Sequence, residues 1–418
     1  MTRNIERMKA NLIIAFLLVT LAFSLFPMDS MAYIESTKSG IFSQTYTDHA
    51  AIFIDGNADL LAQAVSESWE GIGTESDPVI IEGYRISGVA TDGIKIWNVD
   101  LHWIVRDCVI ENAPTACGFY IDNCSNGEFS NNIIRDRDVG IQCYEGTYNC
   151  RFLNNQILNN RDTSFKVLGG MANCIVSGNV FADNLGNNIW ITGGFNDSHI
   201  VRNTIVGGMN AIRITICMRT TITENTVRDS GLDALVFPSA TGIRITGNTI
   251  TNITGNGIMT SGNDAWIESN VVANSTLAGI YVAFGDNSTI THNLLENCTE
   301  YGLKLGGAAT NTTVTENSFI DNNGENSQVI DNGENNLVSY NHYSEWITPD
   351  YDSNGIVDVE YSLDGESDNV DPYPIVDVSG TIPASTPTGN TPADIVLLAV
   401  VGAIAIVLIV AILLMKRR

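Results

Sequence analysis

The strongest constraint on the fold of this chain is a sequence repeat of 22 to 24 residues. An asparagine recurs ten times, each time with an apolar residue three positions before it and another two positions after it. These asparagines are Asn132, Asn155, Asn179, Asn203, Asn225, Asn248, Asn270, Asn293, Asn317 and Asn341. A period this regular predicts a solenoid, in which each repeat is one small unit that buries its apolar face against the next.

The segments between the asparagines have the pattern of strands. A small residue followed by an apolar-any-apolar triplet recurs in each repeat, as at 118–121 (Gly-Phe-Tyr-Ile) and 279–282 (Gly-Ile-Tyr-Val). Each repeat therefore holds three short segments with a period of two, and none with the 3.6-residue period of a helix. The pattern predicts an all-β parallel β-helix of about eleven coils, from near Ile80 to near Asn341. Leucine-rich repeats share the period but need Leu where this chain has Ile, Val and Asn.

The repeated asparagine has a structural interpretation. Asn tolerates left-handed backbone geometry at a tight turn, and its amide can bond the same residue in the coils above and below. We therefore interpret the ten asparagines as a structural ladder rather than a binding site.

The two open ends of a solenoid need caps, because unpaired strand edges invite association with other chains. Residues 57–65 begin with a potential N-cap asparagine and carry an apolar face, which predicts a capping helix within an N-terminal cap, 33–76. The acidic segment 346–377 is expected to close the other end of the β-helix domain, 77–345.

The beginning of the chain predicts export. Residues 1–32 combine a basic start, an apolar run and the small-any-small triplet Ser30-Met31-Ala32, as in a signal peptide. An uncleaved N-terminal anchor is the alternative.

The end of the chain predicts a membrane anchor. Segment 394–415 contains 21 consecutive residues without charge, enough for a single transmembrane helix. The basic tail 416–418 is expected on the cytoplasmic side. The Ser/Thr/Pro-rich segment 378–393 predicts a stalk, so we expect a single-pass protein of the cell membrane with an extracellular ectodomain.

Charge excludes one class of partner. The chain has 47 acidic and 21 basic residues, a formal net charge of −26. Phosphate binding needs a basic face, so we expect no nucleic acid as a partner. We expect no nucleotide cofactor either.

Two segments resemble a known family. The start of the β-helix, 71–84, and its ending, with 341–346, 350–358 and Asp-Pro-Tyr-Pro at 371–374, resemble right-handed β-helix proteins of archaea and bacteria related to NosD, a periplasmic copper-site accessory protein. These belong to a broader group of carbohydrate-binding and sugar-hydrolase β-helix repeats. The resemblance spans about residues 50–376 and implies a right-handed β-helix. It does not specify an activity, because such β-helices include lyases, hydrolases, epimerases, adhesins and accessory proteins.

The resemblance also suggests where a ligand would bind. In sugar-active β-helices the ligand lies along the outward face of one sheet, where aromatic rings stack on sugars and polar groups bond hydroxyls. The corresponding outward positions here are Lys95, Trp97, Tyr120, Asp122, Gln142, Tyr144, Lys166, Trp190 and Arg213. We expect them to bind carbohydrate or a cell-envelope glycan. The alternative is that these side chains only cover the sheet.

Catalysis in such a groove would need paired carboxylates or a metal-assisted base. Asp122 and Glu145 are the acids that the repeat places near the groove, and the Gly-His-Gly and Asp-Pro-His motifs of related enzymes are absent. We expect binding without catalysis. A polysaccharide lyase or hydrolase using the same groove is the alternative.

A copper-site accessory role is a second alternative. Copper sites cluster His, Cys or Met. The five histidines fall on separate coils, so we do not expect copper; they are His49, His102, His199, His292 and His342.

An acidic loop after the last repeat resembles the first part of a calcium loop. Asp350, Asp352, Asn354 and Asp358 occupy ligand positions 1, 3, 5 and 9, although position 12 is Tyr361 instead of Glu. We expect a structural Ca²⁺ here. A simple acidic turn is the alternative.

Two covalent modifications are compatible with an extracellular location. Cys150 and Cys174 both stand five residues before a ladder asparagine, so they are expected on adjacent coils, where they could form a disulfide. Seven N-glycosylation motifs fall on predicted surface turns. Their acceptors are Asn123, Asn196, Asn252, Asn274, Asn287, Asn297 and Asn311.

Overall fold

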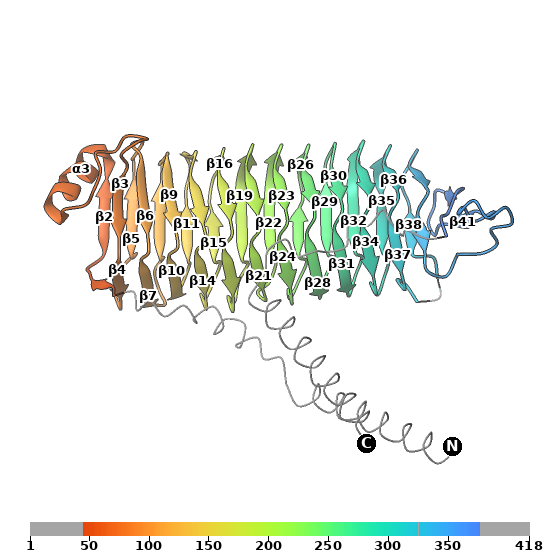
Figure 1. The fold of residues 1–418 in the computed structure, drawn as a ribbon, viewed down its shortest axis with the longest axis horizontal. Coiled ribbons are helices and arrows are strands. Elements are labelled where there is room, and N and C mark those ends of the chain that lie inside the picture. The colour runs from red at the N-terminus through yellow and green to blue at the C-terminus, as the bar shows by residue number, and fades with distance from the viewer. Residues whose placement is uncertain (1–44, 325, 377–418) are drawn as a thin grey trace, which may run out of the picture. The chain divides into compact units, whose positions relative to one another are not determined.

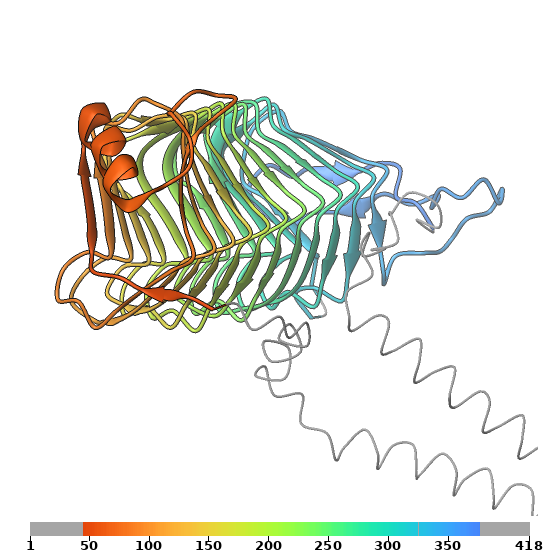
Figure 2. The same ribbon diagram turned by 60° about the vertical axis from the view of Figure 1, so that its left-hand side comes forward.

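The computed structural model describes residues 45–324 and 326–376, which wind into a parallel β-helix (Figure 1). Each coil adds one strand to each of three sheets, and all pairings between coils that are resolved as strand pairs are parallel. Figure 2 shows the successive coils stacked along the rod, and the strand pairing places equal positions of the repeat side by side. The all-β parallel solenoid predicted from the repeat is confirmed.

Sheet A has thirteen strands, in chain order from one end to the other. They are β1 (Thr47–Asp48), β4 (Tyr84–Ser87), β7 (Val109–Ala113), β10 (Ile133–Arg137), β14 (Gln156–Leu158), β18 (Val180–Ala182), β21 (Thr204–Val206), β24 (Thr226–Arg228), β28 (Thr249–Ile253), β31 (Val271–Ser275), β34 (Leu294–Glu296), β37 (Ser318–Ile320) and β40 (His342–Tyr343).

Sheet B has fifteen strands, twelve of which form its main path. The main strands are β2 (Ile52–Asp55), β5 (Ile94–Trp97), β8 (Phe119–Asp122), β11 (Ile141–Cys143), β15 (Phe165–Val167), β19 (Ile189–Asn196), β22 (Ile212–Met218), β25 (Leu235–Phe237), β29 (Ile258–Ser261), β32 (Ile280–Asp286), β35 (Leu303–Thr310) and β38 (Val329–Asp331). The short strands beside them are β12 (Thr147–Tyr148), β16 (Met171–Ala172) and β26 (Ala240–Thr241).

Sheet C has twelve strands. They are β3 (Val79–Glu82), β6 (Trp103–Arg106), β9 (Gly127–Ser130), β13 (Arg151–Leu153), β17 (Ile175–Ser177), β20 (His199–Val201), β23 (Thr221–Thr223), β27 (Arg244–Thr246), β30 (Trp266–Glu268), β33 (Thr289–Thr291), β36 (Thr313–Thr315) and β39 (Leu337–Ser339). Beyond the coils, β41 (Tyr361–Ser362) and β42 (Val370–Asp371) form an antiparallel pair.

The core runs along the inside of the coils as columns of like residues. Every apolar residue three before or two after a ladder asparagine is buried. Aromatic residues in one column stack directly, as Phe129 does on Phe152 with ring centroids 5.0 Å apart. Because strands in register place equal positions above one another, a pattern repeated in sequence becomes a continuous apolar column.

The ten ladder asparagines bond from coil to coil as predicted. The side-chain oxygen of Asn225 accepts from the backbone N–H of Asn203 (3.0 Å) and from its Nδ2 (3.0 Å). Nδ2 of Asn225 in turn donates to the carbonyl of Ile200 (2.9 Å). Each amide therefore satisfies buried backbone groups of other coils, and buried polar groups without partners are costly.

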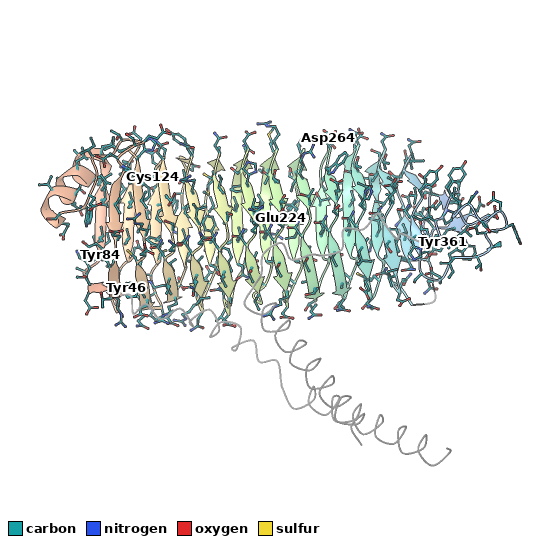
Figure 3. All side chains as sticks on the ribbon, viewed as in Figure 1. Tyr46, Tyr84, Cys124, Glu224, Asp264 and Tyr361 are labelled. Carbon is teal, nitrogen blue, oxygen red and sulfur yellow. The ribbon has the colours of Figure 1, made fainter. Side chains whose placement is uncertain are left out.

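The left-handed geometry proposed for the ladder asparagines is wrong. The positive φ belongs to the residue directly before each of them, such as Asn131 (57°), Glu224 (56°) and His292 (57°). Glu224, which is labelled in Figure 3, occupies this turn position and its side chain is exposed. The residue before each ladder asparagine adopts the positive φ and varies in type. The ladder position itself is restricted to Asn, because its amide makes buried hydrogen bonds.

The N-terminal end begins earlier than the sequence pattern indicated. Strands β1 and β2 already pair with β4 and β5, so the solenoid starts near Thr47 rather than near Ile80. Helix α3 (Gly56–Glu67) follows β2, buries Leu60 and Ala64, and lies at this end of the rod (Figure 1).

The C-terminal end of the ladder is a carboxylate. Oδ2 of Asp371 accepts from the backbone N–H (2.9 Å) and Nδ2 (3.1 Å) of Asn341. Oδ1 accepts from the backbone N–H groups of Tyr340 (3.1 Å) and Tyr373 (3.0 Å). Asp371 is fully buried, and burial raises its pKa although these hydrogen bonds oppose the rise. Segment 346–376 is thereby joined to the last coil.

The predicted signal peptide (1–32), stalk (378–393), transmembrane helix (394–415) and basic tail (416–418) lie outside the described residues. Among the described residues, no helix has the length and apolar character needed to span a bilayer.

Candidate functional site

The outward residues of sheet B form one continuous row, as the repeat predicted. The register pairs Lys95 with Tyr120, Tyr120 with Gln142, and Gln142 with Lys166. It continues from Lys166 to Trp190 and from there to Arg213. We call these six residues the sheet B row. All six are partly exposed, so the structure brings the predicted binding residues together on one face of the rod.

At the N-terminal part of the row, a lysine lies between aromatic rings. The Nζ of Lys95 is 4.2 Å from the ring centroid of Tyr120 and 4.9 Å from that of Trp97. The rings of Tyr120 and Tyr144 are 5.1 Å apart, and Gln142 donates to the Tyr144 hydroxyl (2.9 Å). These contacts hold the rings in place without a ligand, since a cation over an aromatic face is attracted by the ring quadrupole.

The next part of the row repeats this arrangement with a larger ring. Lys166 lies 5.4 Å from the ring centroid of Trp190 and also forms an ion pair with Asp162 (2.9 Å). Arg213, the register neighbour of Trp190, has no ion-pair partner among the described residues. The aromatic face of Trp190 can stack on a sugar ring. The unpaired guanidinium of Arg213 can donate hydrogen bonds at the edge of that sugar ring.

The two candidate catalytic acids lie near this row but are not held by side-chain partners. Asp122 is the register neighbour of Trp97, and Glu145 is exposed on the turn whose backbone carbonyl accepts from Asn123 (2.9 Å). Within the described residues, no side-chain hydrogen bond fixes either carboxylate. Burial, and then the charge of Asp122, raise the pKa of Tyr120 to about 12, so this phenol stays protonated at neutral pH.

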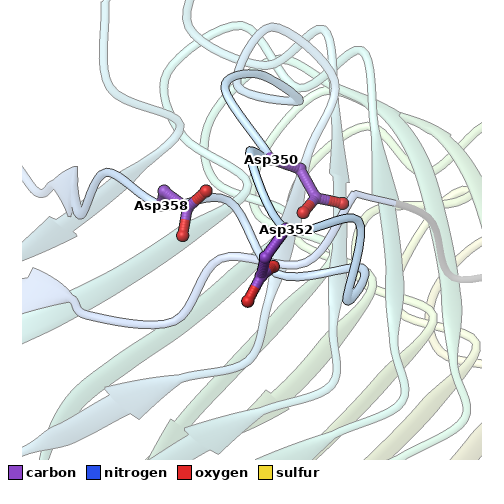
Figure 4. A group of neighbouring side chains, drawn as sticks. All are labelled: Asp350, Asp352 and Asp358. Carbon is purple, nitrogen blue, oxygen red and sulfur yellow. The ribbon is translucent and has the colours of Figure 1, made fainter.

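The acidic loop brings three of its four predicted ligands together. One carboxylate oxygen each from Asp350, Asp352 and Asp358 lies within 4.8 Å of the others (Figure 4). The side-chain oxygen of Asn354 instead accepts from the N–H of Ile356 (2.8 Å). Three converging carboxylates are suitable oxygen ligands for Ca²⁺.

This loop is joined to the last described residues of the chain. The N–H of Val357 donates to the carbonyl of Pro374 (2.7 Å), and the N–H of Val376 donates to the carbonyl of Gly355 (3.0 Å). An ion in the loop would therefore act on the segment that leads out of the β-helix.

The expected disulfide is not formed. All eight cysteines are free and buried, and the backbone N–H of Cys150 donates to Sγ of Cys174 at 3.4 Å. The two residues do lie on adjacent coils, one position before the registered pair of Arg151 and Ile175. Side chains at equal positions of parallel strands point in the same direction rather than toward each other, which disfavours a bridge.

The predicted glycosylation acceptors lie at the surface, and six of the seven have a positive φ. Their amides bond to the preceding coil in several cases, as Asn252 does to Asp229 (3.2 Å) and Asn274 to Asn252 (3.2 Å).

The histidines have separate surroundings. His49 lies 3.6 Å from a carboxylate oxygen of Glu67, and His292 pairs with Glu316 (2.6 Å). His342 contacts the carbonyl of Ile375 (3.2 Å), and His199 is exposed on β20. The structure brings no two of them together in the described residues.

Comparisons with known proteins identify the repeat. Residues 72–253 match the family described as "Periplasmic copper-binding protein (NosD)", and residues 210–358 match "Right handed beta helix region". Among curated protein sequences, none matches this chain.

Solved structures share the fold at low sequence identity. A mannuronic acid specific polysaccharide family 6 lyase from human gut microbiota has 13% identity and a TM-score of 0.51, covering 71% of this chain and 80% of the lyase. The Dettilon tailspike protein has 13% identity and a TM-score of 0.45, covering 69% of this chain and 61% of the tailspike, less than two thirds of its length. The A-module of Azotobacter vinelandii mannuronan C-5 epimerase AlgE4 has 12% identity and a TM-score of 0.44, covering 72% of this chain and 98% of the A-module. At 13% identity, the similarity to the lyase shows a common fold alone.

Proposed function

Because the chain is a NosD-like right-handed β-helix repeat protein, we propose that it binds carbohydrate along the sheet B row, without transforming it. The single observation that supports this most is the alternation of aromatic and hydrogen-bonding side chains along strands in register. Tyr120 and Trp190 stand three coils apart, about 14 Å at the usual strand spacing. Rings at such a spacing along a straight face suit an extended chain of sugar rings.

A binding role fits the acids near the row better than catalysis. Glycoside hydrolysis needs two carboxyl groups held at defined positions across the scissile bond. Asp122 and Glu145 lack side-chain partners that would fix them. The alternative, a polysaccharide lyase or hydrolase, predicts new reducing or unsaturated ends when the protein is incubated with acidic and neutral polysaccharides. Their appearance, and their loss in Asp122→Asn, would replace the binding role with an enzymatic one.

A glycan array probed with the full chain tests the binding role. We expect selective binding to one glycan class, with the signal lost in Tyr120→Ala and Trp190→Ala. Binding that is unchanged in both variants would exclude the sheet B row as the site.

We propose that the protein presents this row outside the cell, anchored by the segment 394–415. The supporting observations are the uncharged 21-residue stretch and the basic tail that follows it. Membrane fractionation with protease treatment of intact cells tests this. A protein found in the soluble fraction, or one protected from protease, would contradict the arrangement.

We also propose that helix α3 caps the N-terminal end. It contacts β2 and β3, and the side chain of Gln63 donates to the carbonyl of Phe53 (2.6 Å) on the outermost strand of sheet B. Covering an edge strand in this way prevents it from pairing with another chain. Disrupting the cap with Leu60→Asp should cause concentration-dependent association, visible by light scattering. A variant that stays monodisperse would argue against a capping role.

A structural Ca²⁺ at Asp350, Asp352 and Asp358 would tie the acidic loop to the segment ending at Val376. The support is the convergence of three carboxylates and the backbone pairing of the loop with that segment. A lower melting temperature after chelation of Ca²⁺ tests it.

A copper-site accessory role is the second candidate function, favoured by the family match over residues 72–253. Cu⁺ and Cu²⁺ titration of the full chain, with His→Ala variants, tests it. Stoichiometric binding that a single His→Ala change abolishes would support this role over carbohydrate binding.

A further inference from the structure

A cavity of about 260 Å³ opens on the outward side of sheet C, away from the sheet B row. It lies over β6, β9 and β13, near the N-terminal end of the rod. Its polar lining consists of Glu75, His102, Asn126, Glu128, Asn149 and Arg151. Because it belongs to a different sheet, a ligand here would not be a ligand of the sheet B row.

The backbone forms one wall of the cavity before any ligand binds. Segment 71–78 is fixed to β6, since the N–H of His102 donates to the carbonyl of Gly73 (3.0 Å) and the N–H of Val79 to the carbonyl of His102 (3.1 Å). The floor follows the strand register, in which Ile104 lies beside Glu128, and Glu128 beside Arg151. A preformed concave site loses little conformational entropy when it binds.

The polar groups of the cavity offer both donors and acceptors. Arg151 pairs with Glu128, which also accepts from the hydroxyl of Ser130 (2.9 Å). The guanidinium side chain is 57% exposed, so much of its donor capacity is free. The side chains of His102 and Glu75 form no hydrogen bond among the described residues. Ile104 adds an apolar surface beside these groups.

The chemistry of the lining excludes several ligand classes. A phosphate or other anion would meet the carboxylates of Glu75 and Glu128. A bound metal ion is not favoured, because the described residues contain no cluster of three ligating side chains at this place. A purely apolar ligand would leave charged groups desolvated and unpaired. A cationic ligand would meet the guanidinium of Arg151, which already pairs with Glu128. This mixed lining favours a neutral ligand whose groups both donate and accept hydrogen bonds.

We propose that this cavity binds a single neutral sugar unit, a role separate from that of the sheet B row. A sugar hydroxyl donates and accepts, so neighbouring hydroxyls can bridge the carboxylate of Glu128 and the guanidinium of Arg151. The C–H face of the ring would lie against Ile104. The volume supports one ring-sized unit, because pockets for larger, drug-sized ligands are about 300–1,000 Å³.

Ligand-observed NMR and calorimetry on the full chain, in a detergent without a sugar headgroup, test the proposal. The probes are the methyl glycosides of glucose, galactose, mannose and N-acetylglucosamine, with glucuronate as a charged comparison. We expect saturable binding of at least one neutral glycoside. Glu128→Gln should weaken it about tenfold, because it removes a charged acceptor and unpairs Arg151.

Two further variants keep the test decisive. Ile104→Trp fills the cavity from an outward position and should abolish binding even where Glu128→Gln affects folding. Glu224→Gln removes a more exposed arginine–glutamate ion pair, with Arg202, elsewhere on the rod and should change the affinity less than twofold.

The outcomes separate this proposal from the role of the sheet B row. Loss of monosaccharide binding in Ile104→Trp, with Trp190→Ala unaffected, supports the cavity. Monosaccharide binding that Trp190→Ala abolishes and Ile104→Trp retains would overturn the cavity proposal and leave the proposed function intact. No saturable binding of any glycoside would also overturn it, while oligosaccharide binding to the row would still stand on its own test.

Discussion

The buried asparagine ladder and the sheet B row are both columns in register, yet their compositions differ completely. The ladder repeats one residue type in ten successive coils, from Asn132 to Asn341. The sheet B row changes type at nearly every coil, from lysine and tyrosine to glutamine, tryptophan and arginine. At the buried ladder position, the same backbone groups need hydrogen-bond partners in every coil, so the same residue, Asn, recurs. Outside, the neighbours are solvent and any ligand, so variation along the rod can encode what is bound.

The largest expected effect breaks the ladder in its middle. Asn225→Ala would leave the N–H and Nδ2 of Asn203 and the carbonyl of Ile200 without these partners in a buried site. We expect a loss of about 3–5 kcal/mol in the free energy of unfolding, measured by chemical denaturation.

The control for this loss is an exposed turn asparagine. Asn252→Gly removes two surface hydrogen bonds, one donated to Asp229 and one accepted from Asn274. Glycine tolerates the φ of 58° at this position. We expect the free energy of unfolding to fall by less than about 1 kcal/mol. Similar losses in both variants would contradict the distinction between buried and exposed columns.

The next effect concerns the carboxylate that ends the ladder. Asp371→Ala would leave the backbone N–H groups of Tyr340, Asn341 and Tyr373 without these acceptors, at a cost of about 2–4 kcal/mol. Because burial raises the pKa of Asp371, the folded protein holds this proton more tightly than the unfolded chain. Its contribution is therefore greatest below the ordinary carboxyl pKa of about 4 and falls as pH rises through the raised value.

The free energy of unfolding is measured for wild type and Asp371→Ala at several pH values. The difference between the two proteins removes the pH dependence that comes from the other carboxyl groups. We expect the cost of the substitution to decrease from pH 4 to pH 7. A cost that increases over this range would show that the hydrogen bonds to Asp371 outweigh its burial.

The smallest effect concerns the acidic loop, which lies outside the repeated columns. Removing Ca²⁺ with a chelator should lower the melting temperature by a few degrees and increase proteolysis near residue 355, because the ion would link the loop to the segment ending at Val376. Asp352→Asn should show the lower melting temperature without chelator. Chelation that changes neither wild type nor this variant would leave an acidic turn as the better description.

Much of the fold could be predicted because a solenoid converts sequence period directly into contacts. The period located the coils and the buried positions beside each ladder asparagine. It could not tell which of two adjacent positions carries the positive φ, because the positions of Glu224 and Asn225 recur with the same spacing in every repeat. It also missed Asp371, which ends the ladder 30 residues after Asn341 instead of 22 to 24 and is not an asparagine.

The candidate sites were predictable to different degrees. The sheet B row followed from register alone, since equal positions of the repeat must align. The cavity on sheet C did not, because one of its walls comes from segment 71–78, which precedes the recognised repeats. The sequence correctly placed Cys150 and Cys174 on adjacent coils. The predicted disulfide between them is not formed, because their side chains point in the same direction.

A pair of tryptophans offers the most direct test of carbohydrate binding on the sheet B row. Trp190 lies 5.4 Å from Lys166 on sheet B, and Trp266 lies 5.5 Å from Arg244 on sheet C, so the two rings have similar cationic neighbours on different faces. The measurement is the dissociation constant of the full chain for the oligosaccharide selected on the array, in wild type, Trp190→Ala and Trp266→Ala. We expect Trp190→Ala to weaken binding about tenfold, or about 1.4 kcal/mol, and Trp266→Ala to stay within twofold of wild type. Equal losses in the two variants, or full affinity in Trp190→Ala, would contradict the assignment of the site to the sheet B row.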